Sequence, residues 1–519
     1  MRGRFLSVQP WIAVCAFVLG AVGVFISLHF RSNAWSPTPY IANTDIGRAY
    51  WEWIQSNLFS AARTDATRAT VEGFQHTMLF LVSLLTWAGG YLAMIRQVAS
   101  DGERRPAARR VFVIAAVVSL PLLLIPCLLS TDVFSYISYG RIAAIYNHNP
   151  YTTTPAEFAG DPAFRWVYWK GVLCVYGPVW LYTSWGSAEL AASFDGGVVA
   201  HLFVLKGIAL VCHFTNGYLI SRIATRRATL YTAIYLLNPL LLIEFVGNAH
   251  NDGFMITILL LGVLCHRRGR RVGAIALFAL AAGTKVWVLP IAGLYCLGWM
   301  RESPGHRAAL GRGAVSLMVV CSVAAALYLP VWAGAQTFAS FASDPSANKL
   351  LNSAAELLSD AGASESSARD LFRVVFLAVC ALLALRTRST DDGLRTGAWF
   401  ALAFCLLGAT WYWPWYATTA LALTAASGLR LGTRAAVLLS LTSLWIYISF
   451  ALGFPHGQTW AGVVGGSLHG VRAAVVFGPV AVLLCLALAE RMPRVYVWPR
   501  LARQAAAHGF VAVRASLGK

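Results

Sequence analysis

The sequence has little charge. Only 12% of its 519 residues are Asp, Glu, Lys or Arg, against about 25% in an average soluble domain. Hydrophobic residues make up 58% of the chain, and the mean hydropathy is +0.62. A chain with so few charges cannot cover itself with a hydrated surface, which excludes a soluble globular protein and a disordered one. Lipid therefore surrounds most of its length.

Acidic residues and paired cysteines are also scarce. The chain has 22 acidic residues against 41 Lys and Arg, which gives a net charge of +19. The basic residues stand in short clusters between apolar runs, a pattern that indicates membrane topology rather than nucleic-acid binding. The ten cysteines fall singly, without a C-x-x-C pair. Neither a zinc site nor a disulfide framework is indicated.

The apolar runs predict an all-α integral membrane protein with about fourteen transmembrane helices. The first run follows a basic start and lacks a small-residue cleavage site, so we expect it to be retained. One membrane domain over 1–490 and a basic cytoplasmic tail over 491–519 are expected. The expected spans are 11–28, 76–96, 111–130, 199–221, 229–247, 252–266, 272–284, 287–300, 313–332, 371–386, 397–411, 415–429, 434–453 and 471–489.

The charge distribution predicts the sidedness of these spans. With both termini in the cytoplasm, roughly 28 of the 41 basic residues lie on the inner face and about 16 of the 22 acidic residues on the outer face. This arrangement requires that the apolar stretch 171–192 does not cross the membrane. We therefore expect three long external loops, over about 31–75, 131–198 and 333–370, in a multi-pass protein of a bacterial inner (plasma) membrane.

The loop after the third span carries a group of polar residues. If this segment is helical, Asp132, Ser135, Tyr136 and Tyr139 lie on one face, at i, i+3, i+4 and i+7. A carboxylate at a membrane boundary beside polar and aromatic groups is a candidate functional site. The alternative is a plain helix N-cap formed with Thr131, which needs no chemistry.

A set of short motifs in order along 111–420 resembles the polyprenyl-phosphate-dependent glycosyltransferases of the GT-C superfamily. Within it, the set is similar to the bacterial α-1,6-mannopyranosyltransferases of actinobacterial lipoglycan synthesis. The motifs are Asp132 after an early helix, Tyr139-Gly140-Arg141, Asn149-Pro150-Tyr151, Tyr176-Gly177-Pro178, Asn238-Pro239, Gly247-Asn248-Ala249-His250-Asn251-Asp252 and Gly283-Thr284-Lys285.

The resemblance implies a GT-C bundle with an active site at the outer face and Asp132 as the general base. It implies transfer of a hexose, with mannose as the expected sugar, from a polyprenyl phosphate to an extracytoplasmic glycan or glycolipid acceptor, with inversion. A lipid-linked sugar phosphate already has a good leaving group, so one base and nearby cations suffice. No cofactor and no metal are expected. The spacing of the residues alone does not separate mannose from glucose, galactose or an arabinofuranosyl donor.

Further site residues are expected around Asp132. The candidate donor-phosphate ligands are Arg141, Lys285 and Lys349; the alternative for these cations is contact with lipid headgroups. For His250, Asn251 and Asp252 the alternatives are helix capping or a metal site, and for Trp411 and Tyr412 the alternative is a membrane-interface belt. The candidate sugar or acceptor contacts are Tyr136, Tyr139, Asn149, Tyr151, Tyr176, His250, Asn251, Asp252, Trp411 and Tyr412.

Two other functions fit a chain with many spans. A transporter or flippase of lipid-linked sugars would also carry charge inside the membrane, such as Lys206, which we expect either to snorkel or to be paired, with Glu244 or Glu189 as its candidate partners. Transporters usually place their polar sites near the midplane and have repeated halves, whereas the acids and special turns here gather in one external loop. A non-catalytic subunit of an envelope complex would not need Asp132.

Overall fold

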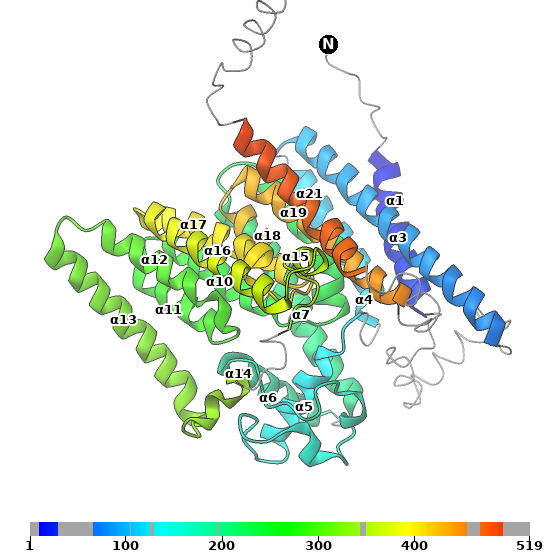
Figure 1. The fold of residues 1–519 in the computed structure, drawn as a ribbon, viewed down its shortest axis with the longest axis horizontal. Coiled ribbons are helices and arrows are strands. Elements are labelled where there is room, and N and C mark those ends of the chain that lie inside the picture. Colours follow the sequence, from blue (N-terminus) through cyan, green and yellow to red (C-terminus); the bar gives the residue numbers. More distant parts are fainter. Residues whose placement is uncertain are drawn as a thin grey trace, which may run out of the picture.

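The part of the chain that the structure describes is mostly helical, as its sequence predicts (Figure 1). The computed structural model describes residues 10–29, 66–103, 105–124, 129–194, 197–342, 349–453 and 468–490. Within these ranges the structure has no β-strand, and only two isolated β-bridges connect extended residues. The all-α fold class is therefore confirmed. The expected cytoplasmic tail, and the part of the expected first external loop before residue 66, lie outside the described residues.

Each expected span coincides with a helix or with a helix interrupted by a bend. The first three are α1 (Pro10–His29), α3 (Ala66–Asp101) and α4 (Arg105–Leu124). The rest are α7 (Val198–Ile223), α8 (Ala228–Leu236) with α9 (Pro239–Leu241) and η4 (Leu242–Gly247), α10 (Asp252–Arg267), α11 (Arg271–Ala282), α12 (Leu289–Arg301), α13 (His306–Tyr328), α16 (Glu365–Arg386), α17 (Thr390–Ala403) with η8 (Phe404–Gly408), α18 (Tyr416–Ala426), α19 (Arg430–Gly453) and α21 (Leu468–Ala489).

The expected count of about fourteen spans is not confirmed. Among the described residues, five helices are long and apolar enough to cross a membrane, or six if the bent α8–η4 pair is one span. Helices α11, α12 and α18 have 12, 13 and 11 residues. At 1.5 Å per residue they are about 16–20 Å long, which is less than the hydrocarbon core of about 30 Å.

One interrupted helix places a polar turn inside the helical bundle. Pro239 cannot donate a backbone hydrogen bond, and the Asn238 side chain accepts from the N–H groups of Leu240 (3.0 Å) and Leu241 (3.4 Å). A new helical segment therefore begins there, and the two parts of the broken helix are bent by 49°. The second part ends in the π-helical turn η4, which contains Glu244.

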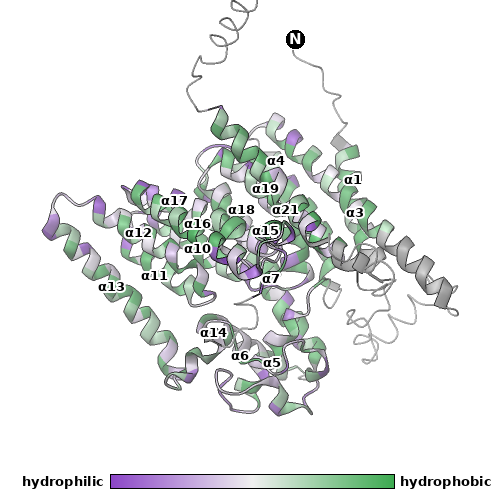
Figure 2. Ribbon diagram, in the orientation of Figure 1, coloured by the Kyte–Doolittle hydropathy of each residue, from purple (hydrophilic) through white to green (hydrophobic). Residues whose placement is uncertain are grey.

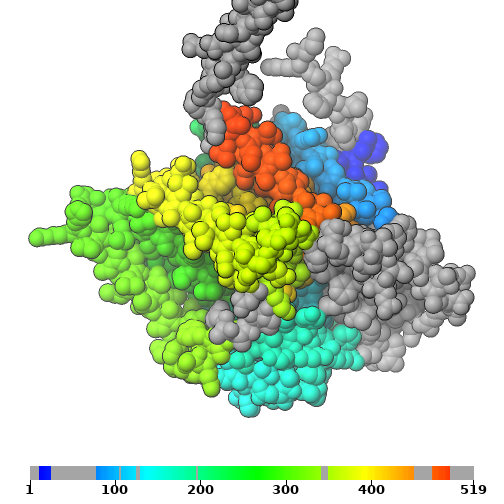
Figure 3. Space-filling model, in the orientation of Figure 1, coloured from blue at the N-terminus to red at the C-terminus, as the bar shows by residue number. Residues whose placement is uncertain are grey.

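The expected external loop 131–198 contains a compact unit at one end of the molecule (Figure 3). This α5–α6 module, residues 129–194, comprises α5 (Asp132–Ala144), η2 (Pro155–Phe158), η3 (Phe164–Trp166) and α6 (Pro178–Ala192). Its core residues Phe134 and Trp180 are buried together with Leu205 of α7. Helix α6 has 15 residues, about 22 Å, so it is too short for a full crossing.

Backbone hydrogen bonds attach the α5–α6 module to the connection between α11 and α12. The N–H of Gly177 donates to the carbonyl of Thr284 (3.0 Å), and the N–H of Val179 donates to the carbonyl of Gly283 (2.9 Å). A Cβ at Gly177 would clash with the carbonyl of Gly283. The sequence motifs containing Gly177 and Gly283 are therefore two sides of one contact.

The arginine-rich connections meet one another at the other ends of several helices. After α12, Glu302 pairs with Arg271 (3.3 Å) and accepts from the N–H of Thr390 (2.7 Å). His266 lies 3.2 Å from Asp391. Three connections, those after α10, α12 and α16, thus form one contact region, and their helices run from it toward the α5–α6 module.

Lys206 lies in the middle of α7 and is 1% exposed. Its Nζ donates to the carbonyl oxygens of Leu122 (3.0 Å) and Gly247 (2.8 Å), near the ends of α4 and η4. Carbonyl groups at helix ends carry partial negative charge, so this buried cation is stabilised by backbone dipoles.

The third expected external loop, 333–370, is partly helical. It contains η7 (Gln336–Phe338), α14 (Ala339–Ala342) and α15 (Glu356–Asp360), and α16 begins within it.

Helix α13 is apolar along most of its length (Figure 2). Unlike the helices around η4, it is little covered by the rest of the protein: only 11% of its most apolar segment is buried. Such an exposed apolar helix needs lipid around it.

Candidate functional site

Asp132 is the first residue of α5. Its N–H donates to the hydroxyl of Ser130 (3.3 Å), and the side chain of the N-cap residue Thr131 makes no capping hydrogen bond. A carboxylate at a helix N-terminus is favoured by the helix dipole. The Asp132 side chain is 20% exposed. Burial raises the pKa of Asp132 to about 6, against a smaller opposing effect from Lys285.

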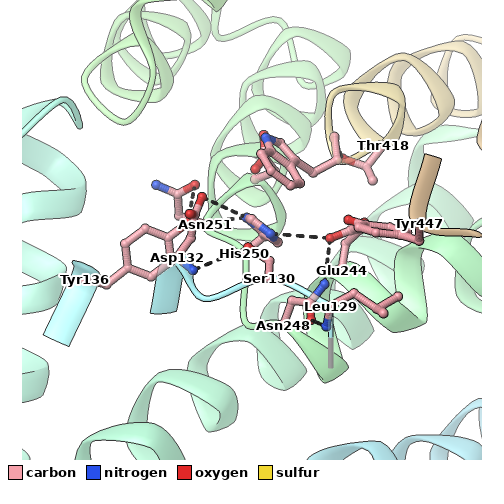
Figure 4. Close-up of polar contacts among 12 residues, drawn as sticks. Leu129, Ser130, Asp132, Tyr136, Glu244, Asn248, His250, Asn251, Thr418 and Tyr447 are labelled. Carbon is pink, nitrogen blue, oxygen red and sulfur yellow. Dashed lines mark hydrogen bonds and ion pairs between the residues drawn. The ribbon is translucent and has the colours of Figure 1, made fainter. Parts of the chain in front are cut away.

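His250 lies behind Asp132 and is fully buried (Figure 4). Its Nδ1 is 4.0 Å from Asp132 Oδ2 and 3.4 Å from the hydroxyl of Tyr136. The Tyr136 hydroxyl also lies 3.4 Å from Asn251 Oδ1, to which it donates. Trp415 stacks on the imidazole, with 4.2 Å between the ring centroids. Burial lowers the pKa of His250 well below its ordinary value, so the ring is neutral.

Glu244 lies on the far side of His250. Its Oε2 is 3.4 Å from His250 Nε2. The hydroxyl of Tyr447 donates to Glu244 Oε1 (2.5 Å), and the amide of Asn248 donates to Oε2 (3.0 Å). Asn248 in turn accepts from the N–H of Leu129 (2.8 Å). The turn that follows η4 is therefore attached to the segment that leads into α5.

The local backbone explains why Glu244 and His250 meet. The π-helical turn η4 ends at Gly247, and Ala249 adopts a left-handed conformation with φ 56°. The N–H of His250 then donates to the carbonyl of Glu244 (2.9 Å). This conformation is unfavourable for a residue other than glycine, so the surrounding contacts must maintain it.

Asp252 and Lys285 form an ion pair beside these residues. Lys285 Nζ donates to Asp252 Oδ2 (2.6 Å); the Asp252 side chain is fully buried and that of Lys285 is 12% exposed. Four buried polar atoms of these two segments lack a hydrogen-bond partner in the described part of the chain: His250 Nε2, Asn251 Nδ2, Asp252 Oδ1 and Thr284 Oγ1. Buried polar atoms without partners are uncommon in proteins, and a bound polyhydroxyl ligand would pair them.

The structure gathers only part of the expected site around Asp132. Tyr136, Tyr176, His250, Asn251, Asp252 and Lys285 come together there; the rings of Tyr136 and Tyr176 are 5.0 Å apart. The other expected residues of the α5–α6 module support its loops. Tyr139 donates to the carbonyl of Val172 (2.9 Å), Asn149 to that of Val331 (2.8 Å), and Tyr151 to that of Tyr176 (2.9 Å).

The remaining expected residues make other contacts. Arg141 is buried and pairs with Asp161 (2.7 Å). It lies nine residues after Asp132 along α5, which corresponds to about 13 Å. Lys349 is exposed. The hydroxyl of Tyr412 is 2.7 Å from that of Ser443 and buried. The half-buried Trp411 forms a β-bridge with Leu351.

Glu244, Tyr447 and Trp415 belong to the site but are not among the residues expected from the sequence. Glu244 could have been identified from the sequence, because an acidic residue inside an apolar run is costly in a membrane and therefore indicates a functional site. Trp415 stands in an aromatic run from which Trp411 and Tyr412 are the expected cavity residues. In the described ranges, no three His, Cys, Asp or Glu side chains converge in a manner suited to a metal ion.

The chain matches a known protein family and several characterised relatives. Residues 44–301 match the family described as α-(1→6)-mannopyranosyltransferase, N-terminal domain. This match includes Asp132, Glu244, His250, Asp252 and Lys285. The chain is 26% identical over 420 residues to α-(1→6)-mannopyranosyltransferase A of Mycobacterium tuberculosis, which covers 73% of this chain and 77% of that protein.

Two relatives from Corynebacterium glutamicum match shorter segments. α-(1→6)-Mannopyranosyltransferase B is 30% identical over 158 residues, which cover 29% of this chain and 25% of that protein. α-(1→6)-Mannopyranosyltransferase A is 25% identical over 170 residues, which cover 32% and 34% of the two chains. The family match, the long alignment and the apolar helical bundle agree with one another. The chain belongs to the α-(1→6)-mannopyranosyltransferase family of GT-C membrane glycosyltransferases.

Proposed function

We propose that this mannosyltransferase moves mannose from a polyprenyl phosphate to a hydroxyl of an extracytoplasmic glycan or glycolipid, with Asp132 as the general base. The observation that carries the proposal is the position of Asp132. It is the partly exposed carboxylate of a buried polar cluster, with 20% of its side chain accessible. An acceptor hydroxyl can approach it from the open side, while its other neighbours hold it in place.

The pKa of Asp132 suits the role of a base. Because burial raises the pKa to about 6, the carboxylate is ionised at neutral pH and is more basic than an ordinary aspartate. Attack by the deprotonated acceptor on the anomeric carbon, opposite the departing phosphate, inverts that carbon. One carboxylate suffices for such a displacement, since the phosphate leaves without being protonated.

Lys285 is the proposed ligand of the donor phosphate. Its side chain is 12% exposed, and its ammonium lies 2.6 Å from Asp252. The charge of Lys285 lowers the pKa of Asp132, so the ammonium is close enough to interact electrostatically with the proposed base. The buried Asn251 Nδ2 and Asp252 Oδ1 offer one donor and one acceptor for sugar hydroxyls. We propose that this cation, rather than a divalent metal, offsets the charge of the phosphate.

The arrangement of charge supports a site on the outer face of a bacterial inner membrane. The arginine-rich connections after α10, α12 and α16 contact one another at helix ends away from the α5–α6 module. Under the positive-inside rule those connections are cytoplasmic. The α5–α6 module, Asp132 and both ends of the Gly177–Thr284 contact are then extracytoplasmic, and both termini are cytoplasmic.

The test is the transfer of radiolabelled mannose from synthetic polyprenyl-phosphate-mannose to a membrane-derived acceptor by the purified full-length chain. Asp132→Asn is expected to fold and to lose transfer by about 100-fold or more, because the amide cannot accept the proton. Glu189→Gln is the matched control, because it also replaces a carboxylate of the α5–α6 module with a carboxamide. The Glu189 carboxylate accepts a hydrogen bond from Trp185 (2.7 Å). It is expected to retain activity.

Two results would contradict the proposal. If Asp132→Asn retains transfer, Asp132 is not the general base, and its role is to favour the start of α5. A folded wild-type protein that transfers mannose from no polyprenyl phosphate, but does so from another activated mannose, would exclude the proposed donor.

A further inference from the structure

The break between α8 and α9 leaves backbone groups without their regular helical partners, and other groups pair them. Pro239 has no N–H to donate to the carbonyl of Tyr235, and this carbonyl accepts from the N–H of Asn238 instead (3.3 Å). The hydroxyl of Tyr91, on α3, donates to the carbonyl of Ile234 (2.9 Å). Inside a membrane, groups freed in this way must be paired by neighbouring helices. The break is therefore a built part of the bundle.

The Asn238 side chain connects this break to two other helices. Asn238 is fully buried, and its Oδ1 accepts from two N–H groups of α9. Its Nδ2 donates to the hydroxyl of Tyr91 on α3 (3.2 Å) and to the hydroxyl of Ser440 on α19 (2.9 Å). A side-chain amide has two lone pairs and two hydrogens to share. Every hydrogen-bonding position of this side chain is therefore used.

The two hydroxyls that face Asn238 are oriented to accept from it. The hydrogen of the Tyr91 hydroxyl is used by the carbonyl of Ile234, and the hydrogen of the Ser440 hydroxyl by the carbonyl of Val437 (2.8 Å). Both hydroxyls therefore present lone pairs to Asn238. A serine at this position could also cap α9, but its single hydrogen could serve only one hydroxyl. Asparagine therefore does more here than cap a helix.

The segment that follows the break carries groups to Asp132. Turn η4 continues directly from α9, and the residues after it lie beside the proposed base (Figure 4). His250 Nδ1 is 4.0 Å from Asp132 Oδ2. The side chain of Asn248 accepts from the N–H of Leu129 (2.8 Å), in the segment that leads into α5. The direction in which η4 leaves the break therefore determines where these groups meet Asp132.

We propose that Asn238 is a positioning residue for Asp132: its two donated hydrogen bonds fix the direction of η4, and thereby the place of His250 beside the base. This inference rests on the proposed function, because it concerns the same base. Asn238 acts through the backbone that connects α9 to η4. The far end of η4 is held separately by Lys206, which donates to the carbonyl of Gly247 (2.8 Å). Loss of the Asn238 contacts therefore releases only one end of the turn.

The first test, Asn238→Ser, separates helix capping from the contacts with α3 and α19. It keeps an oxygen that can accept from the N–H groups of α9 but removes the two-hydrogen donor. A displacement of about 1 Å at an active site can cost about 100-fold in rate, and one end of η4 stays held, so we expect kcat to fall by about 10-fold. The KM for polyprenyl-phosphate-mannose should stay unchanged, because Lys285, the proposed phosphate ligand, belongs to another segment. A residue that only caps α9 predicts the kcat of the wild type.

The second test, Ser440→Ala, removes one acceptor of Asn238 and has a matched control in Ser119→Ala. Both serines are buried and donate within their own helix, Ser440 to Val437 (2.8 Å) and Ser119 to Ala115 (2.7 Å). Only the first substitution touches Asn238, so we expect it to lower kcat by about 3-fold and the control to leave kcat unchanged. The double variant of Asn238→Ser with Ser440→Ala should have the kcat of Asn238→Ser alone, because one contact cannot be lost twice.

The outcomes separate this inference from the proposed function. If Asp132→Asn abolishes transfer but Asn238→Ser lowers only the Tm and leaves kcat unchanged, the inference is wrong and the base assignment stands. Losses that multiply in the double variant would also overturn it. If Asn238→Ser does not fold, Ser440→Ala decides: a kcat equal to that of Ser119→Ala contradicts the inference. If Asp132→Asn retains full transfer, the proposed base itself is wrong.

Discussion

Gly177→Ala should damage both stability and activity, because Gly177 lies in the contact that attaches the α5–α6 module. Its backbone conformation, φ −69° and ψ 165°, suits alanine, so only space is lacking. The added Cβ would clash with the Gly283 carbonyl. The two segments would have to separate by about 1 Å to restore normal contact. That movement would weaken the hydrogen bonds from Gly177 to Thr284 and from Val179 to Gly283.

The magnitude follows from these contacts. Two hydrogen bonds contribute about 1 kcal/mol each, and crowding a close contact costs about 1–3 kcal/mol, so we expect a loss of about 3 kcal/mol. Lys285 directly follows this contact and would shift relative to Asp132. A displacement of about 1 Å at an active site can cost about 100-fold in rate. We therefore expect kcat/KM for mannose transfer to fall by at least about 10-fold.

The assays are thermal unfolding of the detergent-solubilised protein and mannose transfer by the same preparation. Gly171→Ala is the matched control, because it lies on the same loop and no atom lies within 4 Å of the position that its Cβ would occupy. It should change neither measurement. If the Tm and kcat/KM of Gly177→Ala equal those of Gly171→Ala, the contact does not position the module, and the reasoning is refuted.

Three further predictions concern the chemistry. First, kcat/KM should fall as the pH drops through about 6, because the raised pKa of Asp132 leaves the base protonated below that value; a profile flat down to pH 5 would exclude Asp132. Second, Lys285→Met should lower transfer and destabilise the fold by about 3–5 kcal/mol by leaving Asp252 buried without a cation; the double variant with Asp252→Asn should regain Tm but not transfer. Third, EDTA should leave transfer unchanged, and a loss restored by Mg²⁺ would contradict metal independence.

The helical fold could be predicted from the sequence, but the lengths of its helices could not. Apolar runs indicate where helices form, since lipid requires the backbone to be hydrogen-bonded within each segment. They do not predict that Asn238 and Pro239 divide one run into two segments bent by 49°. The bend depends on a side chain that caps the new segment, which hydropathy does not measure.

The candidate site was predictable where the residues are close in sequence, and unpredictable where the tertiary structure brings them together. The helical spacing of Asp132 and Tyr136 predicts their common placement. The pairing of Arg141 with Asp161 depends on the path of an irregular loop, so its role could not be read from its charge. The stack of Trp415 on His250 depends on how distant helices pack, and periodicity contains no information about such pairs.

The position of Lys206 has a consequence for how the chain is made. As ribosomal synthesis proceeds from the N-terminus, the carbonyl of Leu122 exists before Lys206, whereas that of Gly247 is made later. A lysine at the centre of a spanning helix opposes insertion by about 2.5–3.5 kcal/mol. Helix α7 therefore enters the bilayer with the Leu122 carbonyl of α4 already available to its lysine, and the Gly247 carbonyl becomes available only when η4 arrives. The lysine thus favours assembly in the order α4, α7, η4. The segment around η4, which places His250 next to Asp132, is then completed only after α4 and α7 are inserted.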